Sequence, residues 1–233
     1  MRAVILTGGE GRRLRPYTTV FPKPLMPVGE RPILEIVVGQ LHDAGFTRLT
    51  FAVGYLASLI QAYFNDGSRF GVAIEYSLES LPLGTAGPLS LIDRPDEDFL
   101  VMNGDILTDL DYSRLMEHHK ASGAVATLAV FQKEVPISLG VLELDDSGAV
   151  THYIEKPCLR YPVSTGVYCF RPMVLDVLEK NTRLELPDLI RTLIARGDSV
   201  QAYEFEGYWL DIGRPEDYEA AIALLRTDDS IRG

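Results

Sequence analysis

Glycines and basic side chains gather near the start of the chain, directly after a short apolar run. The order is Gly8-Gly9-Glu10-Gly11-Arg12-Arg13-Leu14, and Pro22-Lys23-Pro24 follows a few residues later. Glycines in this place let backbone N–H groups approach phosphate oxygens, and a guanidinium and an ammonium group can neutralise the charge on leaving pyrophosphate. The segment therefore predicts a phosphate site with Arg13 and Lys23 as its cations. A plain glycine turn with solvated arginines is the structural alternative.

Two common phosphate motifs do not fit this segment. In G-x-G-x-x-G a third glycine is needed where Arg13 and Leu14 stand, and G-x-x-x-x-G-K-[ST] is not matched either. A dehydrogenase with a dinucleotide-binding half is therefore disfavoured, and a failure to bind nicotinamide nucleotides would exclude it.

The distribution of charge favours a small polyanion as ligand. The chain of 233 residues has a formal net charge of -11, yet residues 1–29 hold five basic side chains and one acid. A nucleic acid or an anionic membrane selects for a basic face, so the acidic remainder argues against both as partners.

Two aspartates stand where a metal ion could be held. Asp105 follows the apolar run Phe99 to Met102, and Asp211 follows Tyr208-Trp209-Leu210. Mg2+ prefers a few carboxylates together with phosphate oxygens and water, so the two aspartates predict a magnesium site if the fold brings them together. The alternatives are a turn or capping role for Asp105 and an ion pair between Asp211 and Arg214.

The elements that must position these residues alternate between strands and helices in the first half of the chain. This is the pattern of βαβ units with a largely parallel sheet, in which ligands bind at the carboxyl ends of the strands. Pro32 is expected at the first position of a helix that Gly45 ends. The expected strands are Ala3–Thr7, Thr50–Val53, Val72–Tyr76 and Phe99–Met102, and the expected helices follow Pro32 and span Leu56–Phe64.

The second half is richer in strands. Four strand-like runs follow in close succession, with a turn at Asp145-Asp146-Ser147-Gly148, and they predict antiparallel strands added to the sheet as one wall of a sugar pocket. The runs are Ala124–Phe131, Gly140–Leu144, Val150–Glu155 and Val163–Phe170, and helices are expected at 172–180, 187–196 and 215–226.

The motifs together resemble the sugar-1-phosphate nucleotidylyltransferases, most of all the mannose-1-phosphate guanylyltransferase branch. That family's G-G-x-G-x-R-L, P-x-T and P-K are matched by Gly8 to Leu14, Pro16-Tyr17-Thr18 and Pro22-Lys23. Further matches follow in the family's order at 83–87, 103–105, 155–157, 165–168 and 209–213. The resemblance implies an α/β fold of the nucleotide-diphospho-sugar transferase type: a Rossmann-like, mostly parallel mixed sheet with helices on both faces.

The resemblance also implies roles for individual residues. Arg13, Lys23, Asp105 and Lys156 would be catalytic, and Asp105 and Asp211 would hold Mg2+. The sugar 1-phosphate would be bound by Gly140, Glu155, Lys156, Thr165 and Gly166. The nucleotide would be bound by Leu6, Gly8, Gly9, Gly11, Arg13, Lys23, Glu79, Gly84, Thr85, Asn103 and Gly104. A surface ion pair is the alternative for Glu155 and Lys156.

Glu79 is the residue expected to select the base. It precedes Gly84 by five residues, a position that resembles the one reading the base edge in relatives that often carry glutamine. A carboxylate only accepts hydrogen bonds, so it complements the N1–H and N2 amino donors of guanine better than a uracil or thymine edge. The sequence thus favours GTP, with a solvated loop carboxylate as the alternative.

The expected reaction is in-line attack of a sugar-phosphate oxygen on the α-phosphorus of the NTP, giving an NDP-sugar and pyrophosphate. A non-catalytic, nucleotide-sugar-binding regulatory subunit on the same fold is the alternative; it predicts loss of the catalytic positions, which are all present.

Composition predicts a cytoplasmic protein without a membrane span. The first apolar run is too short for a signal segment or a span, and Cys158 and Cys169 are too few for a disulfide framework. The four histidines lack metal-ligand spacing, with His118 and His119 expected on a polar helix face. We expect residues 1–233 to form a single catalytic domain without the C-terminal β-helix of some relatives, and a homo-oligomer through that domain is compatible with the sequence.

Overall fold

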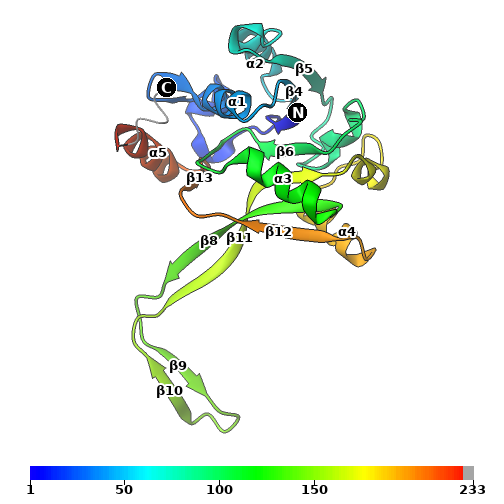
Figure 1. Ribbon diagram of the computed structural model, residues 1–233. Coiled ribbons are helices and arrows are strands. Elements are labelled where there is room, and N and C mark those ends of the chain that lie inside the picture. Colours follow the sequence, from blue (N-terminus) through cyan, green and yellow to red (C-terminus); the bar gives the residue numbers. More distant parts are fainter. Residues whose placement is uncertain (228–233) are drawn as a thin grey trace.

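The chain forms a central sheet of seven strands, seen in the computed structural model, which describes residues 1–227 (Figure 1). Their order across the sheet is β12-β8-β11-β6-β1-β4-β5, and β11 alone runs antiparallel to its neighbours in it. The strands are β1 (Arg2–Leu6), β4 (Arg48–Val53), β5 (Ala73–Leu78), β6 (Phe99–Asn103), β8 (Ala126–Pro136), β11 (Cys158–Phe170) and β12 (Val200–Glu204).

Helices cover both faces of this sheet. On one face the side chains of α1, α2 and α3 pack against alternate strand residues such as Ala3 and Ile5. On the other face α4 packs against the intervening residues, such as Val4, because successive side chains of a strand point to opposite faces. The α/β prediction is therefore confirmed. The helices are α1 (Ile33–Asp43), α2 (Ala57–Phe64), α3 (Tyr112–Ser122), α4 (Leu186–Ala195) and α5 (Pro215–Thr227).

The strands expected in the first half form within one or two residues of their predicted bounds. Pro32 caps α1 one position earlier than expected, and Gly45 follows the helix with φ +83°. The segment predicted as a helix at 172–180 forms only a 3-10 turn, Pro172–Val177. His119 differs from expectation, because it is fully buried against the sheet and hydrogen-bonded to Thr127.

Two short ribbons complete the fold near the sheet. β7 (Ile106–Thr108) pairs antiparallel with β13 (Trp209–Asp211), and β2 (Pro27–Val28) pairs with β3 (Arg31–Pro32). A third core cluster lies under α5, where Leu14 and Ile212 meet. The β7–β13 pairing joins segments about a hundred residues apart, which no local pattern in the sequence indicated.

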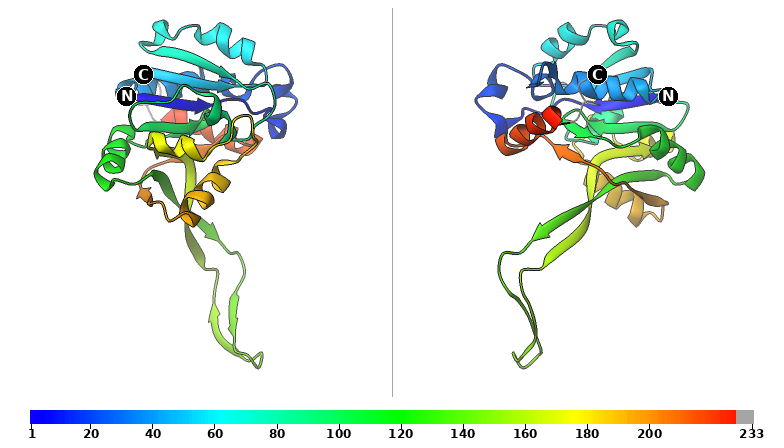
Figure 2. Two further views of the ribbon diagram at one scale, coloured as in Figure 1. Left: turned by 90° about the vertical axis from the view of Figure 1, so that its right-hand side faces the viewer. Right: turned by 60° about the vertical axis from the view of Figure 1, so that its left-hand side comes forward.

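The prediction that all the later strands join the sheet is correct for β8 and β11 and wrong for the two between them. β9 (Val141–Leu144) and β10 (Val150–Ile154) pair only with each other, as a hairpin at the end of the long β8–β11 ribbon. Figures 1 and 2 show this ribbon and hairpin projecting away from the body of the molecule. We call residues 133–163 the arm. In the part of the chain that the structure describes, no helix is long and apolar enough to cross a membrane.

Candidate active site

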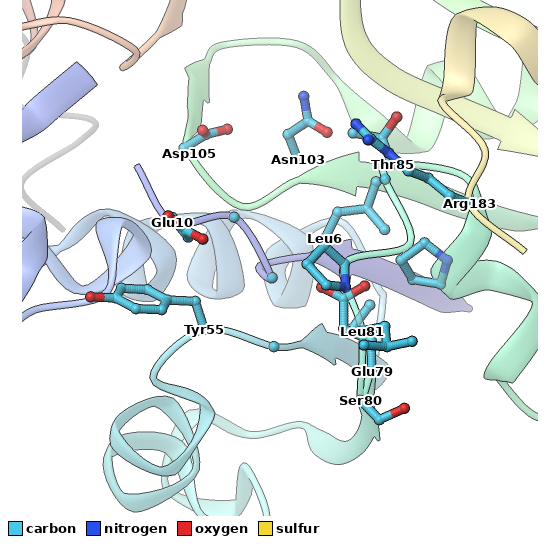
Figure 3. Close-up of a pocket in the computed structure, with 17 residues that line it drawn as sticks. Leu6, Glu10, Tyr55, Glu79, Ser80, Leu81, Thr85, Asn103, Asp105 and Arg183 are labelled. Carbon is cyan, nitrogen blue, oxygen red and sulfur yellow. The ribbon is translucent and has the colours of Figure 1, made fainter. Parts of the chain in front are cut away.

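A cleft of about 530 Å3 opens at the carboxyl ends of β1, β4 and β6. Leu6 and Asn103 close the floor from neighbouring strands, and Thr85 and Arg183 lie together at one side (Figure 3). This is the sheet edge at which the sequence placed the ligand. The lining residues are Leu6, Gly8, Gly9, Glu10, Ala52, Gly54, Tyr55, Glu79, Ser80, Leu81, Pro82, Gly84, Thr85, Pro88, Asn103, Asp105 and Arg183.

The glycine segment leads from this cleft into an adjoining hollow of about 280 Å3, lined by Arg13 and Lys23 among others. Gly11 turns the chain with φ +60°, and its carbonyl accepts hydrogen bonds from the Thr18 hydroxyl at 2.8 Å and from Leu14 N at 2.9 Å. A Cβ at Gly11 would lie 2.9 Å from Thr18 Cγ2, so the turn leaves no room for a side chain. The predicted phosphate loop and its two cations therefore border one hollow.

Lys23 lies between the two aspartates of the predicted metal site. Its Nζ contacts Asp105 Oδ2 and is 3.8 Å from Asp211 Oδ1. The β7–β13 pairing creates this arrangement, because it sets Asp211 opposite Ile106, the residue after Asp105, and Ile212 N donates to the Asp105 carbonyl at 3.1 Å. Lys23 is only 8 % exposed, so its charge acts in a site with little solvent screening.

The environment of Asp105 and Asp211 favours a further positive charge between the two carboxylates. Burial, and then the Asp105 carboxylate, raise the pKa of Asp211, while Lys23 and Arg13 oppose the shift. Asp105 Oδ1 is buried without a hydrogen-bond partner. A buried carboxylate oxygen without a partner is costly, and a cation placed beside it would satisfy it.

The two aspartates therefore fit the chemistry of Mg2+, which accepts two carboxylates and takes its other ligands from phosphate and water. No group of three or more His, Cys, Asp or Glu side chains able to hold a metal ion by themselves occurs within residues 1–227. The alternative ion pair with Arg214 is not formed: Asp211 faces Lys23, and the Arg214 backbone N–H donates to Asp217 at 2.8 Å. Arg13 lies beside the segment that follows Asp211, since a Cβ at Gly213 would be 3.0 Å from its guanidinium.

Glu79 lies at the opposite end of the cleft from Asp105 (Figure 3). Its Oε2 accepts the Leu83 N–H at 3.0 Å, and its carboxylate lies against Gly8 and Gly54, where any side chain would collide with it. Glu79 is therefore a positioned residue rather than a freely solvated one. Its other oxygen, Oε1, is the atom nearest to both glycines.

The loop after Glu79 is held by a segment that lies far away in the sequence. Gly84 has φ +78°, and a Cβ there would lie 2.6 Å from the Leu184 carbonyl, which accepts hydrogen bonds from Ala86 N and Gly87 N. Glu185 Oε2 accepts from both the N–H and the hydroxyl of Thr85, each at 3.0 Å. These contacts fix the wall of the cleft that we expect to face the base.

The structure brings two of the predicted sugar-site residues to the cleft region and holds three away from it. Gly166 packs against Asn103, and the Thr165 hydroxyl is buried and donates to Ala129 O at 2.8 Å. Three residues lie on the arm instead: Gly140, Glu155 and Lys156. Lys156 Nζ is 3.8 Å from Glu155 Oε1, and both side chains are exposed. Gly104 packs against Thr7, since a Cβ there would lie 2.8 Å from Thr7 Cγ2.

Sequence reasoning did not identify four of the lining or supporting residues: Glu10, Tyr55, Arg183 and Glu185. Glu10 stands inside the glycine segment, where it pairs with Arg12 and Arg15. Arg183 and Glu185 precede α4 in a segment without any motif. Only the tertiary contact with the Gly84 loop reveals them.

The model of the nucleotidyl transferase family matches residues 2–228 of this chain. Among curated proteins, the chain is 36 % identical to a UTP–glucose-1-phosphate uridylyltransferase of Synechocystis sp. over 95 % of its own length and 62 % of the relative's. It is 33 % identical to a mannose-1-phosphate guanyltransferase of Candida albicans, over 97 % of its length and 65 % of the relative's. The chain thus spans somewhat less than two thirds of the length of these relatives.

Two solved structures have similar folds. A Bacillus anthracis protein described as a glucose-1-phosphate thymidylyltransferase superposes with a TM-score of 0.80 at 26 % identity, covering 98 % of this chain and 96 % of the other. HddC of Yersinia pseudotuberculosis superposes with a TM-score of 0.74 at 23 % identity, covering 96 % and 99 %. The second likeness concerns the fold alone.

Proposed function

This chain belongs to the nucleotidyl transferase family, and on that basis we propose that it transfers a nucleoside monophosphate from an NTP to a sugar 1-phosphate. The observation that carries the proposal is the position of Lys23, a buried cation between Asp105 and Asp211 at the edge of the nucleotide-sized cleft. A cation and two carboxylates at one point suit a triphosphate that is bound together with a divalent ion.

In the proposed reaction an oxygen of the sugar phosphate attacks the α-phosphorus of the NTP. The new bond is that between this oxygen and the α-phosphorus; the bond to the bridging oxygen of the β-phosphate breaks, and pyrophosphate leaves with the electron pair. No general base is required, because the attacking oxygen already carries a negative charge at neutral pH. Positioning and charge neutralisation supply the catalysis.

The chain's own residues divide this work. Lys23 and Arg13 neutralise the charge of the leaving pyrophosphate, and the Gly8–Gly11 turn presents backbone N–H groups to the phosphates. Asp105 and Asp211 would hold Mg2+, which supplies further neutralisation of phosphate charge when bound. Lys23 orients Asp105 through their contact, so the two act as a unit.

We further propose that the base is guanine. The relatives include both guanylyl and uridylyl enzymes, so family membership leaves the base open. Support comes from Glu79, a carboxylate that lines the cleft and whose Oε2 is held by Leu83 N–H. An acceptor carboxylate complements the two adjacent donors of guanine and repels the carbonyl oxygens of uracil.

The test is pyrophosphate release with Mg2+ from GTP, UTP, dTTP, CTP and ATP against a panel of sugar 1-phosphates. We expect turnover that is fastest with GTP and falls at least about a hundredfold in Lys23→Ala and Asp105→Asn. Lys180→Ala, an exposed lysine outside the cleft, is the matched control and keeps wild-type turnover. Binding of nucleotide sugars without turnover for any pair would replace the proposal with a regulatory, non-catalytic role.

A further inference from the structure

Three basic residues border the hollow that adjoins the cleft, one more than the two cations that the glycine segment predicted. They are Arg12, Arg13 and Lys23, and Asp105 is the only acid among the described residues that line this hollow. Negative charge develops on pyrophosphate as it leaves, so every cation at this place can stabilise it. Arg12 therefore supplies one of three positive charges where they would be used.

Arg12 is nevertheless held by a carboxylate of its own loop. Its Nε and Nη2 donate to the two carboxylate oxygens of Glu10, at 2.7 and 3.2 Å. This is the bidentate geometry with which an arginine also binds a phosphate group. The donors along one edge of the Arg12 guanidinium are thus engaged by Glu10.

The turn after Gly11 sends the two neighbouring arginines in different directions. Arg12–Leu14 form one 3-10 turn, in which successive side chains point about 120° apart. The Arg13 guanidinium is directed to Gly213, beside the metal site, whereas Arg12 reaches back to Glu10. Arg13 is therefore fixed within the site, and Arg12 stands at its edge.

The Glu10–Arg12 pair lies where the cleft passes into the hollow. Of the described residues that line these two spaces, Glu10 belongs to the cleft alone and Arg12 to the hollow alone. Gly9 and Asp105 line both. In Figure 3 Glu10 lies toward the Asp105 end of the cleft, with Glu79 at the other end. A nucleotide with its base beside Glu79 would extend its phosphates past this pair.

The pair can open at little cost. The Arg12 side chain is 74 % exposed and that of Glu10 is 37 % exposed, so water screens their attraction. Arg15 Nη2 lies 3.6 Å from the same Glu10 oxygen, which leaves a cation near Glu10 when Arg12 moves away. The hydrogen bond from Arg12 lowers the pKa of Glu10, so this carboxylate is ionised at neutral pH. Phosphate groups, which carry more negative charge than one carboxylate, compete for the same guanidinium.

We propose that Arg12 is a third phosphate-binding cation that changes partners during the reaction. Glu10 holds it in the free chain, and the two phosphates that leave as pyrophosphate take it when an NTP is bound. By competing for Arg12, Glu10 lowers the affinity for pyrophosphate and favours its release. This role rests on the proposed function, but the exchange of partners can be measured without turnover.

The first experiment measures the affinity for magnesium pyrophosphate by isothermal titration calorimetry. Losing charge-assisted hydrogen bonds in Arg12→Gln should weaken binding about tenfold. Arg15→Gln removes the same charge from the same loop, at a position outside both linings, and should weaken binding by no more than about twofold. Equal losses in the two variants would assign the effect to the overall charge of the loop and overturn the proposal. So would a wild type that does not bind pyrophosphate.

A double-mutant cycle tests the exchange itself. Glu10→Gln should tighten pyrophosphate binding about threefold, because it frees Arg12, and should hardly change the affinity of Arg12→Gln. The matching prediction for the cycle is a coupling between the two positions that Arg15→Gln does not share with Arg12. The same tightening with and without Arg12 would show that Glu10 merely repels the anion, and the exchange would be wrong.

Pyrophosphorolysis of the NDP-sugar, the reverse reaction, shows which phosphates Arg12 contacts. Arg12→Gln should raise the KM for pyrophosphate about tenfold and leave the KM for the NDP-sugar unchanged, since the NDP-sugar lacks the phosphates that leave. A rise in both KM values would place Arg12 at the α-phosphate and contradict its assignment to pyrophosphate. A wild type without turnover for any substrate pair would fail the proposed function, while the measured affinities for pyrophosphate would still decide the exchange.

Discussion

Glu185 accepts two hydrogen bonds from Thr85 through a single carboxylate oxygen, one from the backbone N–H and one from the hydroxyl, each 3.0 Å long. The Thr85 hydroxyl in turn accepts from Leu186 N at 2.7 Å. Burial alone would raise the pKa of Glu185, but hydrogen bonds from Arg183 and Thr85 hold it below its usual value. An ionised Glu185 thus fixes the loop that lines the expected base pocket.

Glu185→Ala should weaken nucleotide binding more than it slows the chemical step. Losing hydrogen bonds to a charged group costs about 1–3 kcal/mol, so we expect a KM for the NTP raised roughly tenfold with kcat changed little. Steady-state kinetics with varied NTP measure this split. Glu204→Ala, an exposed glutamate on β12, serves as the control. An unchanged KM would show that the loop holds its position without Glu185.

Gly84→Ala should unfold more readily than a matched glycine variant. Gly84 and Gly197 have φ of +78° and +80°, so adding a Cβ at either position should lower the free energy of unfolding by about 1 kcal/mol. At Gly84 the Cβ also meets Leu184 O at 2.6 Å, whereas at Gly197 it meets nothing within 4 Å. The collision should lower the free energy of unfolding of Gly84→Ala by a further amount of about 1–3 kcal/mol. Urea unfolding of the two variants measures this difference. Equal stabilities would mean that the loop can shift freely.

Glu79→Gln should change the choice of base while leaving the loop intact. The glutamine carbonyl can still accept the Leu83 N–H, so the fold is preserved, but its amide can donate to a uracil carbonyl. We expect the ratio of kcat/KM for GTP over UTP to fall about tenfold. Glu10→Gln neutralises another carboxylate that lines the cleft and should leave the ratio unchanged. If both variants lowered the GTP/UTP ratio of kcat/KM equally, the effect would come from the loss of a negative charge in the cleft and not from contact with the base.

His119 should make the fold sensitive to mild acid. Burial lowers its pKa below 6.5, helped by Arg171, His118 and Lys120 and opposed by Asp98, whose Oδ2 is 3.8 Å from Nε2. Because the folded chain holds the neutral ring, its stabilisation is complete above pH 6.5 and is lost as pH falls below that value. The loss is at most about 1.4 kcal/mol per pH unit.

The free energy of unfolding, measured from pH 7.5 down to 5.5, tests this slope. His119→Asn keeps a partner for Thr127 without a titrating ring, so its stability should depend less on pH than that of the wild type. His152→Asn removes an exposed histidine and should retain the wild-type slope. If the free energy of unfolding of the wild type depended on pH as little as that of His119→Asn, the buried ring would accept a proton without cost.

The sequence by itself located the sheet edge of the cleft, the glycine turn with its two cations, and the two aspartates. Glycines directly after β1 and acidic residues after apolar runs are local signals, and hydrophobic spacing located the strands that carry them. The family resemblance supplied the roles. These features depend on residues that are close in the chain, where the chemistry of a side chain and its neighbours is readable.

Only the tertiary structure decided which distant residues meet. The β7–β13 pairing places Asp211 beside Lys23, and the segment before α4 supplies Glu185 to Thr85, although neither segment carries a pattern that names its partner. The direction of the arm was likewise beyond the sequence, because alternating apolar residues predict a strand without stating what will cover it. Long-range pairing is set by the packing of the whole chain. For this reason the sequence predicted Lys156 in the sugar-phosphate site, whereas the fold places it on the arm.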